Sequence, residues 1–252
     1  MMEPVYEKMF AIRSYEVDSH GLVRPTALLN YMQEAAGGHS KLLGVAVRDL
    51  MPQGLTWVLS RTHLRIEGEA RSREELRVRT WPSSRVGRFS CREFELTAAG
   101  GTPIARATCS FAVLDLDTRR PVVISDRLPV YPLLSRRALA DDFPTLPRLT
   151  SIGTELSFRV GRSDLDVNRH ANNVVYADWA LETVPPDVAE CCLLVDLEIA
   201  YRAEVFYGET VVARCGELSG GREPVFVHQL AREDGTELTR LVTRWHTRGN
   251  PA

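Results

Sequence analysis

The chain carries one arrangement of residues twice, and this repeat limits the folds that are possible. In each half an aromatic residue, an acidic residue, a second aromatic residue and a glutamate follow one another at the same spacings. They are Phe10, Asp18, Tyr31 and Glu34 in the first half and Phe158, Asp166, Trp179 and Glu182 in the second. After this region the offset changes, and Glu69 aligns with Glu204. A repeat with one insertion or deletion is what an internally duplicated fold requires, so we expect two similar units in tandem.

Each half also carries the same order of predicted elements, one helix followed by a series of strands. Pro25 opens a helix at a position that tolerates its missing N–H, and apolar residues recur on one face up to Gly37 and Gly38. Alternating or apolar runs between turn residues predict strands near residues 6–15, 57–65, 76–81, 88–98, 103–114 and 122–124. The second half predicts a strand near residues 155–161, a helix from 173 to 183 and strands near 193–201, 210–217, 223–232 and 237–247. The predicted fold class is α+β, with an antiparallel sheet wrapping a helix in each unit.

The connection between the two units is marked by a change in composition. Prolines return between residues 129 and 147, and clear alternation of apolar and polar residues stops there. We therefore expect a first unit over residues 1–130, a linker over residues 131–152 and a second unit over residues 153–252.

Composition and charge exclude several classes of function. The 252 residues are 44% hydrophobic and 25% charged, which is ordinary for a soluble globular protein and enough for a full-sized core. The formal net charge of -2 predicts no general attraction to nucleic acid. The N-terminus lacks the basic start and apolar run of a signal peptide, and no later segment approaches the length of a membrane span. We therefore expect a cytoplasmic protein with no membrane span.

The cysteines favour the same compartment. They are odd in number and show no metal-ligand spacing, which suits reduced thiols better than a disulfide framework. We expect structural thiols at Cys91, Cys109, Cys191, Cys192 and Cys215.

Residues 163–179 concentrate acids, amides and a histidine, and then turn apolar with roughly helical spacing. Asn172 or Asn173 is suited to cap the predicted helix, because its side-chain oxygen can accept a backbone N–H of the first turn. The loop would then bring Asp166, Asn168 and His170 close to a helix N-terminus. Free N–H groups and the helix dipole favour an oxygen that gains negative charge there, such as that of a carbonyl under attack.

The residues alone permit three interpretations of this loop. Asp and Asn commonly make a turn and cap a helix, with no further role. A calcium loop would use Asp164, Asp166 and Asn168, but Arg169 stands where Gly is needed and Val175 where a bidentate Glu is needed. A catalytic loop is the third interpretation, since alternate residues of an extended segment point the same way. The turn and the catalytic site both remain open at this point.

A longer motif extends through the loop into the predicted helix. It reads Asp166-x-Asn168-x-His170-x-Asn172-Asn173-x-x-Tyr176-x-x-Trp179. This motif resembles the active-site signature of the acyl-acyl-carrier-protein thioesterases, hot-dog enzymes of plant plastids and many bacteria. Further along, Tyr201-Arg202-Ala203-Glu204 resembles the second motif of that family, whose Glu is counted with the catalytic Asp, Asn and His.

One departure from the family pattern is informative. In the plant enzymes a Cys follows that Glu, whereas here the position is Val205, which argues against an older Cys-His-Asn nucleophile scheme. Residues 109–121 also resemble the end of the family's first half, so the resemblance spans nearly the whole chain. It implies two tandem hot-dog units, each a long helix wrapped by an antiparallel sheet, that form an internal pseudo-dimer.

The resemblance implies a hydrolase that releases free fatty acid from a fatty acyl chain on acyl carrier protein and so ends chain elongation. It implies no metal and no organic cofactor. The implied catalytic residues are Asp166, Asn168, His170 and Glu204. The two carboxylates would attack directly or activate water, while the amide and the imidazole would orient the reacting groups. Backbone N–H groups at Asn172 and Asn173 would hold the oxyanion. Which carboxylate acts, and whether an acyl-enzyme forms, stays open.

The two halves differ at the positions that carry this chemistry. His20 and Leu22 of the first half stand where the second half has Asn168 and His170, so only the second half has the full set. The resemblance favours the first unit as the acyl-chain pocket. Apolar side chains at core spacing on its helix suit such a pocket, or a plain core, equally well. These are Leu28, Tyr31, Met32 and Ala35.

The resemblance implies a carrier whose docking helix is acidic, so the enzyme needs a local basic surface. The near-neutral net charge of the chain does not show where such a surface lies. Arginine suits such a surface because its planar fork pairs with carboxylates and phosphates. The chain has two pairs of adjacent arginines, although such pairs also occur on plain solvated faces. They are Arg119 with Arg120 and Arg136 with Arg137. A homodimer is also possible.

Two other functions compete with hydrolysis of acyl carrier protein esters. A thioesterase for coenzyme A esters has identical chemistry at the carbonyl, and only the thiol carrier differs. A non-catalytic acyl-binding protein would bury the same helices, yet it would need no Asp, Asn and His in one loop. A thiol-release assay that compares the two carriers over a range of chain lengths separates these possibilities.

Overall fold

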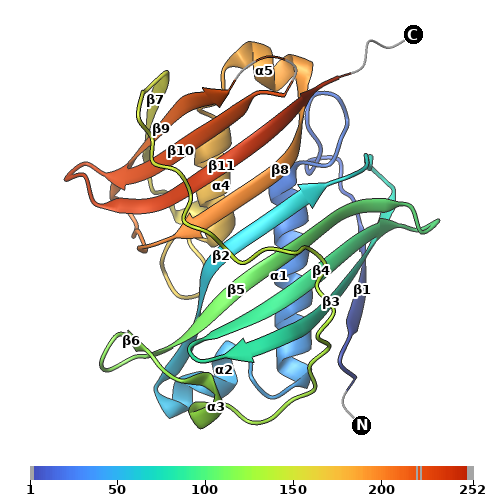
Figure 1. Cartoon of the computed structure of the whole chain (residues 1–252), viewed down its shortest axis with the longest axis vertical. Coiled ribbons are helices and arrows are strands. Elements are labelled where there is room, and N and C mark those ends of the chain that lie inside the picture. The colour runs from blue at the N-terminus through green and yellow to red at the C-terminus, as the bar shows by residue number, and fades with distance from the viewer. Residues whose placement is uncertain (1–2, 220, 222, 249–252) are drawn as a thin grey trace. The chain divides into compact units, whose positions relative to one another are not determined.

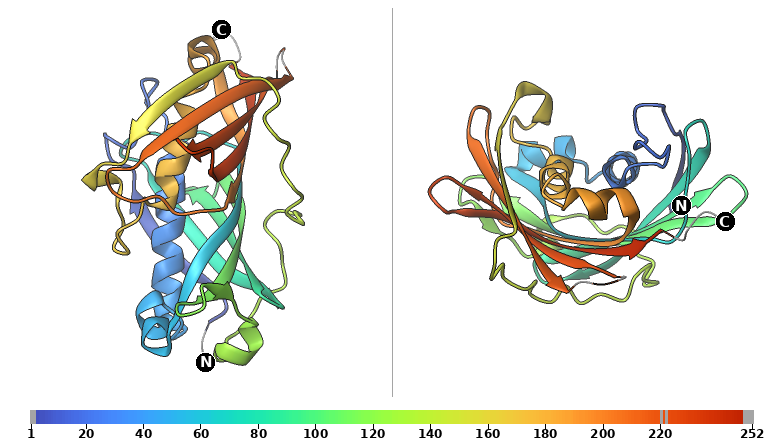
Figure 2. Two further views of the ribbon diagram at one scale, coloured as in Figure 1. Left: turned by 90° about the vertical axis from the view of Figure 1, so that its left-hand side faces the viewer. Right: turned by 90° about the horizontal axis from the view of Figure 1, so that it is seen from above.

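The computed structural model describes residues 3–219, 221 and 223–248. The chain divides between Asp142 and Phe143 into two compact units. Each unit is an antiparallel sheet that curves around a helix of its own (Figures 1 and 2). This arrangement confirms the predicted α+β class.

The first unit contains a sheet with strand order β1-β3-β4-β5-β2, in which every neighbouring pair is antiparallel, and the short strand β6 pairs with β5. Its strands are β1 (Tyr6–Ala11), β2 (Leu55–Ile66), β3 (Glu75–Val86), β4 (Phe89–Ala98), β5 (Pro103–Asp115) and β6 (Arg120–Pro121). Its helices are α1 (Pro25–Leu42), α2 (Val47–Leu50), η1 (Met51–Gln53) and α3 (Ile124–Arg127). Helix α1 lies against one face of the sheet and buries the apolar residues that its periodicity predicted.

The end of one helix and the end of one strand in the first unit differ from the prediction. Helix α1 passes through Gly37 and Gly38 and ends at Leu42, just before Gly44, whose φ is +68°. Gly38 does not end the helix. Its missing side chain lets Tyr6 pack closely against the helix, since a Cβ there would lie 2.8 Å from the Tyr6 hydroxyl. Strand β1 ends at Ala11 because the Glu16 carboxylate accepts the N–H of Arg13 and so closes a turn.

The strand predicted at residues 122–124 is wrong. The pairing with β5 is made by Arg120 and Pro121, after a tight turn in which Arg119 has a φ of +56°. Val122 adds one bond to Val113, and the backbone then turns into α3 at Ile124. A short apolar run cannot by itself distinguish a strand from the first turn of a helix.

The second unit repeats the strand order of the first. Its order, β7-β9-β10-β11-β8, matches β1-β3-β4-β5-β2 strand for strand. Its strands are β7 (Thr154–Arg159), β8 (Cys192–Tyr201), β9 (Thr210–Ser219), β10 (Val225–Arg232) and β11 (Glu237–Thr247). Its helices are η2 (Arg162–Asp164), α4 (Asn173–Leu181) and α5 (Pro186–Cys191), of which α5 was not predicted. Each half thus folds in the same order, as the internal repeat requires.

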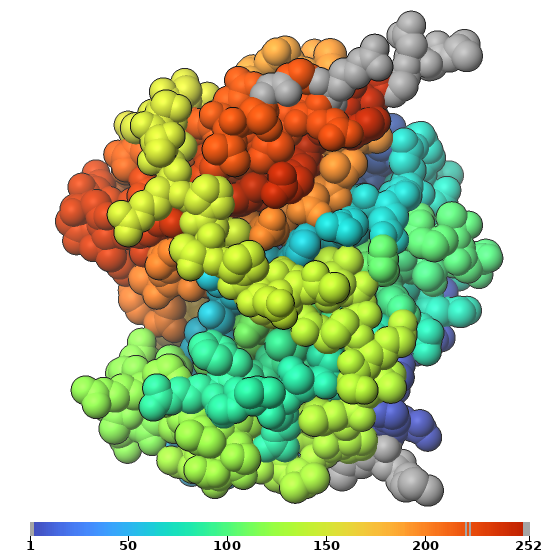
Figure 3. Space-filling model, viewed as in Figure 1, coloured from blue at the N-terminus to red at the C-terminus, as the bar shows by residue number. Residues whose placement is uncertain are grey.

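Residues 128–153 form no helix or strand, and each part of this segment packs on its own unit. In the first unit the Trp81 indole N–H donates to the carbonyl of Arg136, and Leu134 donates to Pro82. Figures 1 and 3 show the segment running across the side of this sheet that faces away from α1. In the second unit it packs against the sheet through one apolar cluster, made of Leu146, Leu149, Ala200, Val225, Val227 and Val242.

Among the described residues, every helix is too short or too polar to cross a lipid bilayer.

Candidate active site

The loop before α4 is a tight turn that brings the predicted acid and histidine together. The N–H of Asp166 donates to the carbonyl of His170 at 3.0 Å, and the N–H of Arg169 donates back to the carbonyl of Asp166 at 3.0 Å. Arg169 adopts a φ of +67°, in the left-handed region. Asp166 and His170 therefore stand side by side at the base of the turn, and Asn168 lies at its tip.

The side chain of Asp166 organises this turn. One carboxylate oxygen accepts the backbone N–H of Asn168 at 2.8 Å. The other accepts the Asn168 side-chain amide at 3.3 Å and lies 3.7 Å from His170 Nδ1. Both oxygens of Asp166 thus have hydrogen-bond donors close by, which fixes the orientation of the carboxylate.

Glu204 reaches the same histidine from the other side. It lies in the loop after β8, and the N–H of Ala171 donates to the carbonyl of the next residue, Val205, at 2.9 Å. This contact sets Glu204 Oε1 3.8 Å from His170 Nε2. Each nitrogen of the imidazole therefore faces a different carboxylate. The side chains of His170, Asp166 and Glu204 keep 20%, 21% and 34% of their surface exposed, which leaves the cluster open to a substrate.

The N-terminus of α4 adjoins this cluster, and Asn172 caps it as predicted. Asn172 Oδ1 accepts the N–H of Val174 at 3.0 Å, and the Asn172 carbonyl accepts the N–H of Val175 at 2.9 Å. The N–H of Asn172, which the motif implied would hold an oxyanion, instead donates to the backbone carbonyl of Asp164 at 2.8 Å. In this first turn, the N–H of Asn173 is thus the one left for a substrate oxygen.

Two tyrosines of the sequence motifs tie α4 to the Glu204 loop. The Tyr176 hydroxyl donates to the carbonyl of Ala203 at 3.3 Å, and the Tyr201 hydroxyl donates to the carbonyl of Asn173 at 3.2 Å. The two rings meet edge to face, with their centroids 6.0 Å apart. Burial raises the pKa of Tyr176, so its hydroxyl stays a hydrogen-bond donor. Sequence reasoning gave these tyrosines no structural role, although both lie in the motifs.

The first unit builds the same turn without the histidine. The N–H of Asp18 donates to the carbonyl of Leu22 at 2.8 Å. The N–H of Gly21, whose φ is +76°, donates to the backbone carbonyl of Asp18 at 3.0 Å. Leu22 is buried where the second unit has His170. Glu69, the counterpart of Glu204, pairs with Arg71 at 3.2 Å. The geometry confirms that the loop is duplicated, whereas a buried leucine stands in the first unit where the second has the imidazole.

The residues predicted to bind the acyl chain separate into two groups. Leu28, Met32 and Ala35 are buried on α1. Tyr31 is turned toward β1, where its ring stacks on Phe10 and its hydroxyl donates to Glu16 at 2.5 Å.

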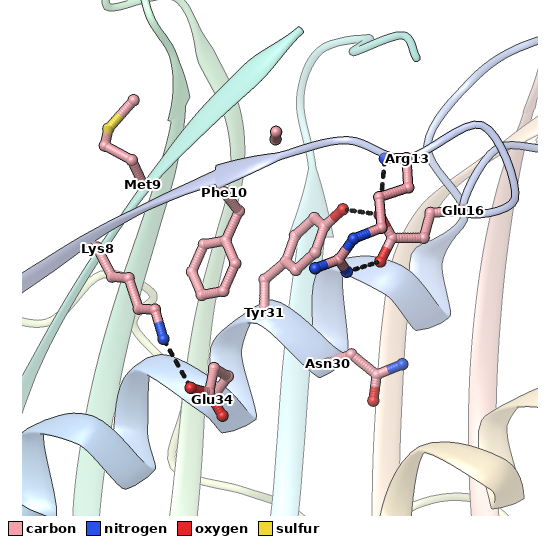
Figure 4. Close-up of a pocket in the computed structure, with 9 residues that line it drawn as sticks. Lys8, Met9, Phe10, Arg13, Glu16, Asn30, Tyr31 and Glu34 are labelled. Carbon is pink, nitrogen blue, oxygen red and sulfur yellow. Dashed lines mark hydrogen bonds and ion pairs between the residues drawn. The ribbon is translucent and has the colours of Figure 1, made fainter. Parts of the chain in front are cut away.

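Tyr31 lines a cavity of about 480 Å³ beside β1 and α1 (Figure 4). The ion pairs Lys8–Glu34 and Arg13–Glu16 form much of its wall. A wall of this kind does not suit a hydrocarbon chain.

The two arginine pairs also differ from each other. Arg119 and Arg120 are exposed in the hairpin between β5 and β6. Arg136 pairs with Glu95, and its guanidinium lies 4.1 Å from the centre of the Trp81 ring. Arg137 pairs with the fully buried Glu93 at 2.8 Å. The second pair is therefore engaged within the first unit.

Comparison with known proteins finds one family along nearly the whole chain. The model for the acyl-ACP thioesterase N-terminal domain matches residues 3–129, and that for the acyl-ACP thioesterase C-terminal domain matches residues 149–247. The chain is 28% identical to dodecanoyl-[acyl-carrier-protein] hydrolase of Cinnamomum camphora over 260 residues and 28% identical to palmitoyl-acyl carrier protein thioesterase of Cuphea hookeriana over 261. Each alignment covers 96% of this chain, which spans 67% and 62% of those two chloroplastic relatives.

Solved structures agree with this assignment. The 12:0-ACP thioesterase from Umbellularia californica matches with a TM-score of 0.87 at 25% identity, over 98% of this chain and 96% of that chain. An acyl-ACP thioesterase from Bacteroides thetaiotaomicron shares the fold, with a TM-score of 0.84 at 23% identity over 96% and 98% of the two chains. These likenesses confirm the hot-dog fold that the sequence predicted. With both domain models matched in order, the chain belongs to the acyl-ACP thioesterase family.

Proposed function

We propose that the chain hydrolyses fatty acyl thioesters of acyl carrier protein at the cluster of Asp166, Asn168, His170 and Glu204. The observation that supports this site is the position of His170, whose two nitrogens lie 3.7 Å and 3.8 Å from two different carboxylates. The N-terminus of α4 follows two residues later and supplies a donor for an oxyanion. The names of the relatives support the substrate.

The two carboxylates take different roles. Both oxygens of Asp166 are engaged by the turn, so Asp166 positions Asn168 and His170. Glu204 is the more exposed carboxylate and takes the proton from an attacking water. The water oxygen bonds to the thioester carbon, and the N–H of Asn173 stabilises the negative charge on the carbonyl oxygen. The C–S bond then breaks, and the proton passes through His170 to the leaving thiolate. The products are a free fatty acid and the carrier's thiol.

Three substitutions test this site. Asp166→Asn, His170→Ala and Glu204→Gln should each lower kcat/KM by about a hundredfold or more, as expected when an acid, a base or its positioning partner is lost. The matched control is Glu69→Gln, which changes the corresponding residue of the first unit and should leave the rate within about twofold of wild type. Thiol release from acyl carrier protein esters and from coenzyme A esters is measured in parallel. Near-wild-type rates in all three variants would refute the site, and a preference for coenzyme A esters would refute the carrier.

The first unit supplies the acyl-chain pocket in this proposal, and Arg119 with Arg120 supplies the docking surface for the acidic carrier. Leu28, Met32 and Ala35 are the side chains of α1 that would face the chain. The protein works in the cytoplasm, where its five cysteines stay reduced; all five are free. Separation by size under native conditions tests whether it acts as a homodimer.

A further inference from the structure

The loop that carries Glu204 has little regular structure to hold it. It runs from the end of β8 to the start of β9, and Arg202 and Ala203 both donate to the carbonyl of Leu238. Glu209 closes its far end, because its carboxylate accepts the N–H of Phe206 at 2.6 Å. Between these two anchors, the carbonyls of Ala203 and Val205 accept the Tyr176 hydroxyl and the Ala171 N–H, on either side of Glu204. A partner on the backbone of Glu204 itself would hold the residue whose side chain lies beside His170.

Arg232, the last residue of β10, supplies that partner. Its Nη2 donates to the backbone carbonyl of Glu204, and its Nε donates to Glu209 Oε1 at 3.0 Å. One planar guanidinium thus links the two parts of the loop, and its own charge is balanced by Glu209. The Arg232 side chain is about three-quarters buried, so it lies under the loop rather than in bulk water.

The first unit has the same loop without this arginine. Leu76 pairs with Ala98 in the first sheet as Val211 pairs with Arg232 in the second. Ala98 donates its N–H to Thr102 at 2.9 Å, and Arg232 donates its N–H to Thr236 at 2.9 Å. Ala98 is therefore the counterpart of Arg232.

The glutamate that closes the loop occurs in both units. Glu74 accepts the N–H of Arg71 at 3.0 Å, as Glu209 accepts that of Phe206. The capped loop is thus common to both units, whereas the arginine occurs in the unit that also carries the histidine.

We infer that Arg232 is a positioning residue, which holds the backbone of Glu204 so that the carboxylate stays beside His170. This inference rests on the proposed function, since it assumes that Glu204 takes part in hydrolysis. A loop free to shift by an ångström would lose the geometry on which proton transfer depends. Removal of the guanidinium should therefore slow the chemical step and leave the binding of the carrier and the chain unchanged.

The test compares Arg232→Ala, which copies the first unit, with Arg214→Ala on β9. Arg214 is also partly buried and forms an ion pair at 2.6 Å, but its partner is Glu155 on β7 rather than a residue of the Glu204 loop. We expect Arg232→Ala to lower kcat by about tenfold or more with KM within about twofold, whereas Arg214→Ala keeps both values. Both variants should lose a similar, small amount of thermal stability. Equal kcat values in the two variants would overturn the inference.

A second variant separates positioning from folding. Arg232→Lys keeps the charge next to Glu209, but an ammonium cannot reproduce the planar fork that reaches both acceptors. It should fold like the wild type and show a kcat between those of wild type and Arg232→Ala. Added guanidinium ion should partly restore the activity of Arg232→Ala. If Arg232→Lys is as fast as wild type and guanidinium restores nothing, the role is structural.

A double variant distinguishes failure of this inference from failure of the proposed function. In a Glu204→Gln background, Arg232→Ala should cause little further loss, since the side chain that it positions is already inactive. Activity retained in Glu204→Gln alone would refute the catalytic role of Glu204, and the positioning role with it. An inactive Glu204→Gln together with a fully active Arg232→Ala would refute the positioning role alone.

Discussion

Asp18 and Asp166 occupy the same position in the same turn of the two units. Asp18 Oδ1 accepts the N–H groups of His20 and Leu22, both at 2.9 Å, and Asp166 Oδ1 accepts the N–H of Asn168 at 2.8 Å. A carboxylate here therefore has a structural role that does not depend on catalysis. In the second unit the same side chain also faces a histidine, and the added role can be measured by comparing the two positions.

The first prediction uses this pair to separate turn formation from chemistry. Asp18→Ala and Asp166→Ala should lower Tm by similar small amounts, because each removes the side chain that closes a partly exposed turn. Only Asp166→Ala should abolish hydrolysis. Calorimetry and a thiol-release assay on both variants check this prediction. Comparable losses of activity in the two variants would mean that the turn, and not the carboxylate beside His170, limits the rate.

The second prediction concerns the cysteines. Burial raises the pKa of Cys109 to about 12 and that of Cys215 to about 11, so neither forms a reactive thiolate near neutral pH. Cys191 is exposed, and Val205, which follows Glu204, is fully buried. Iodoacetamide under native conditions should therefore modify Cys191 first and leave hydrolysis largely intact. Mass spectrometry locates the modified thiol, and a loss of activity that tracks one cysteine without unfolding would restore a cysteine nucleophile.

The third prediction tests the docking surface. Arg119→Glu with Arg120→Glu should raise KM for acyl carrier protein several-fold at low salt and change little with a small thioester analogue, because only the carrier contacts this surface. The control Arg48→Glu reverses another exposed charge of the first unit. Equal effects on the two substrates would place docking elsewhere.

The other arginine pair should behave differently in the same experiment. Arg137 neutralises the fully buried Glu93, so Arg137→Glu should lower Tm before any effect on the carrier can be measured. A normal Tm for Arg137→Glu, with a raised KM for the carrier alone, would show that this arginine docks the carrier.

Features held by local contacts were the ones that the sequence could predict. The cap at Asn172 and the turn at Asp166 join residues of one short loop, and their residue types indicate their bonds. The repeat of elements followed from periodicity, which each half shows independently. The motif then predicted that Glu204 and His170 lie in one site, and the structure places Glu204 Oε1 3.8 Å from His170 Nε2.

Features that depend on distant partners were missed or misplaced. Gly38 looked like a helix stop, because nothing nearby in the sequence shows that Tyr6 packs against it. Arg137 was predicted to lie on a surface that docks the carrier, because nothing nearby in the sequence shows that it pairs with Glu93 on β4. The sequence pattern predicted no role for Arg232. Its counterpart in the first unit is the uncharged Ala98, so the two units differ at this position. An alignment of the halves by strand register reveals this difference, whereas alignment by residue spacing alone does not.

The fourth prediction is a loss of stability at mildly acidic pH. His228 is fully buried between the hydroxyls of Thr183 and Thr243, and burial lowers its pKa to about 3. In the unfolded chain a histidine has a pKa of about 6.5, so below this pH the unfolded state binds a proton that the folded state does not. The free energy of unfolding should therefore fall as the pH drops from about 6.5 toward about 4.5.

His39 adds to this effect, because burial and the nearby Arg92 lower its pKa to about 4. Urea denaturation across this pH range measures the slope, and His228→Gln should make it shallower. A slope that is the same in the variant and the wild type would show that other groups govern the acid sensitivity.

The fifth prediction concerns the acyl chain. Leu28 and Met32 are buried on α1 and stand at core spacing, whereas the cavity beside Tyr31 has charged walls. Each buried methylene contributes about 0.8 kcal/mol, so a change in the depth of an apolar pocket should move chain-length preference by a few carbons. Met32→Trp should favour shorter chains and Leu28→Ala longer ones, while the rate on the best substrate stays close to wild type. Gas chromatography of the released fatty acids measures the profile.

Val45→Ala is the matched control for these two substitutions, since Val45 is equally buried but belongs to a separate apolar cluster with Leu50 and Leu55. It should lower Tm somewhat less than Leu28→Ala, because it removes two buried carbon atoms rather than three, and leave the profile unchanged. Two results would contradict the assignment of the chain pocket to the first unit. One is a change in Tm without any change in profile for the α1 variants. The other is a profile that responds instead to substitution of Val175 or Trp179 on α4.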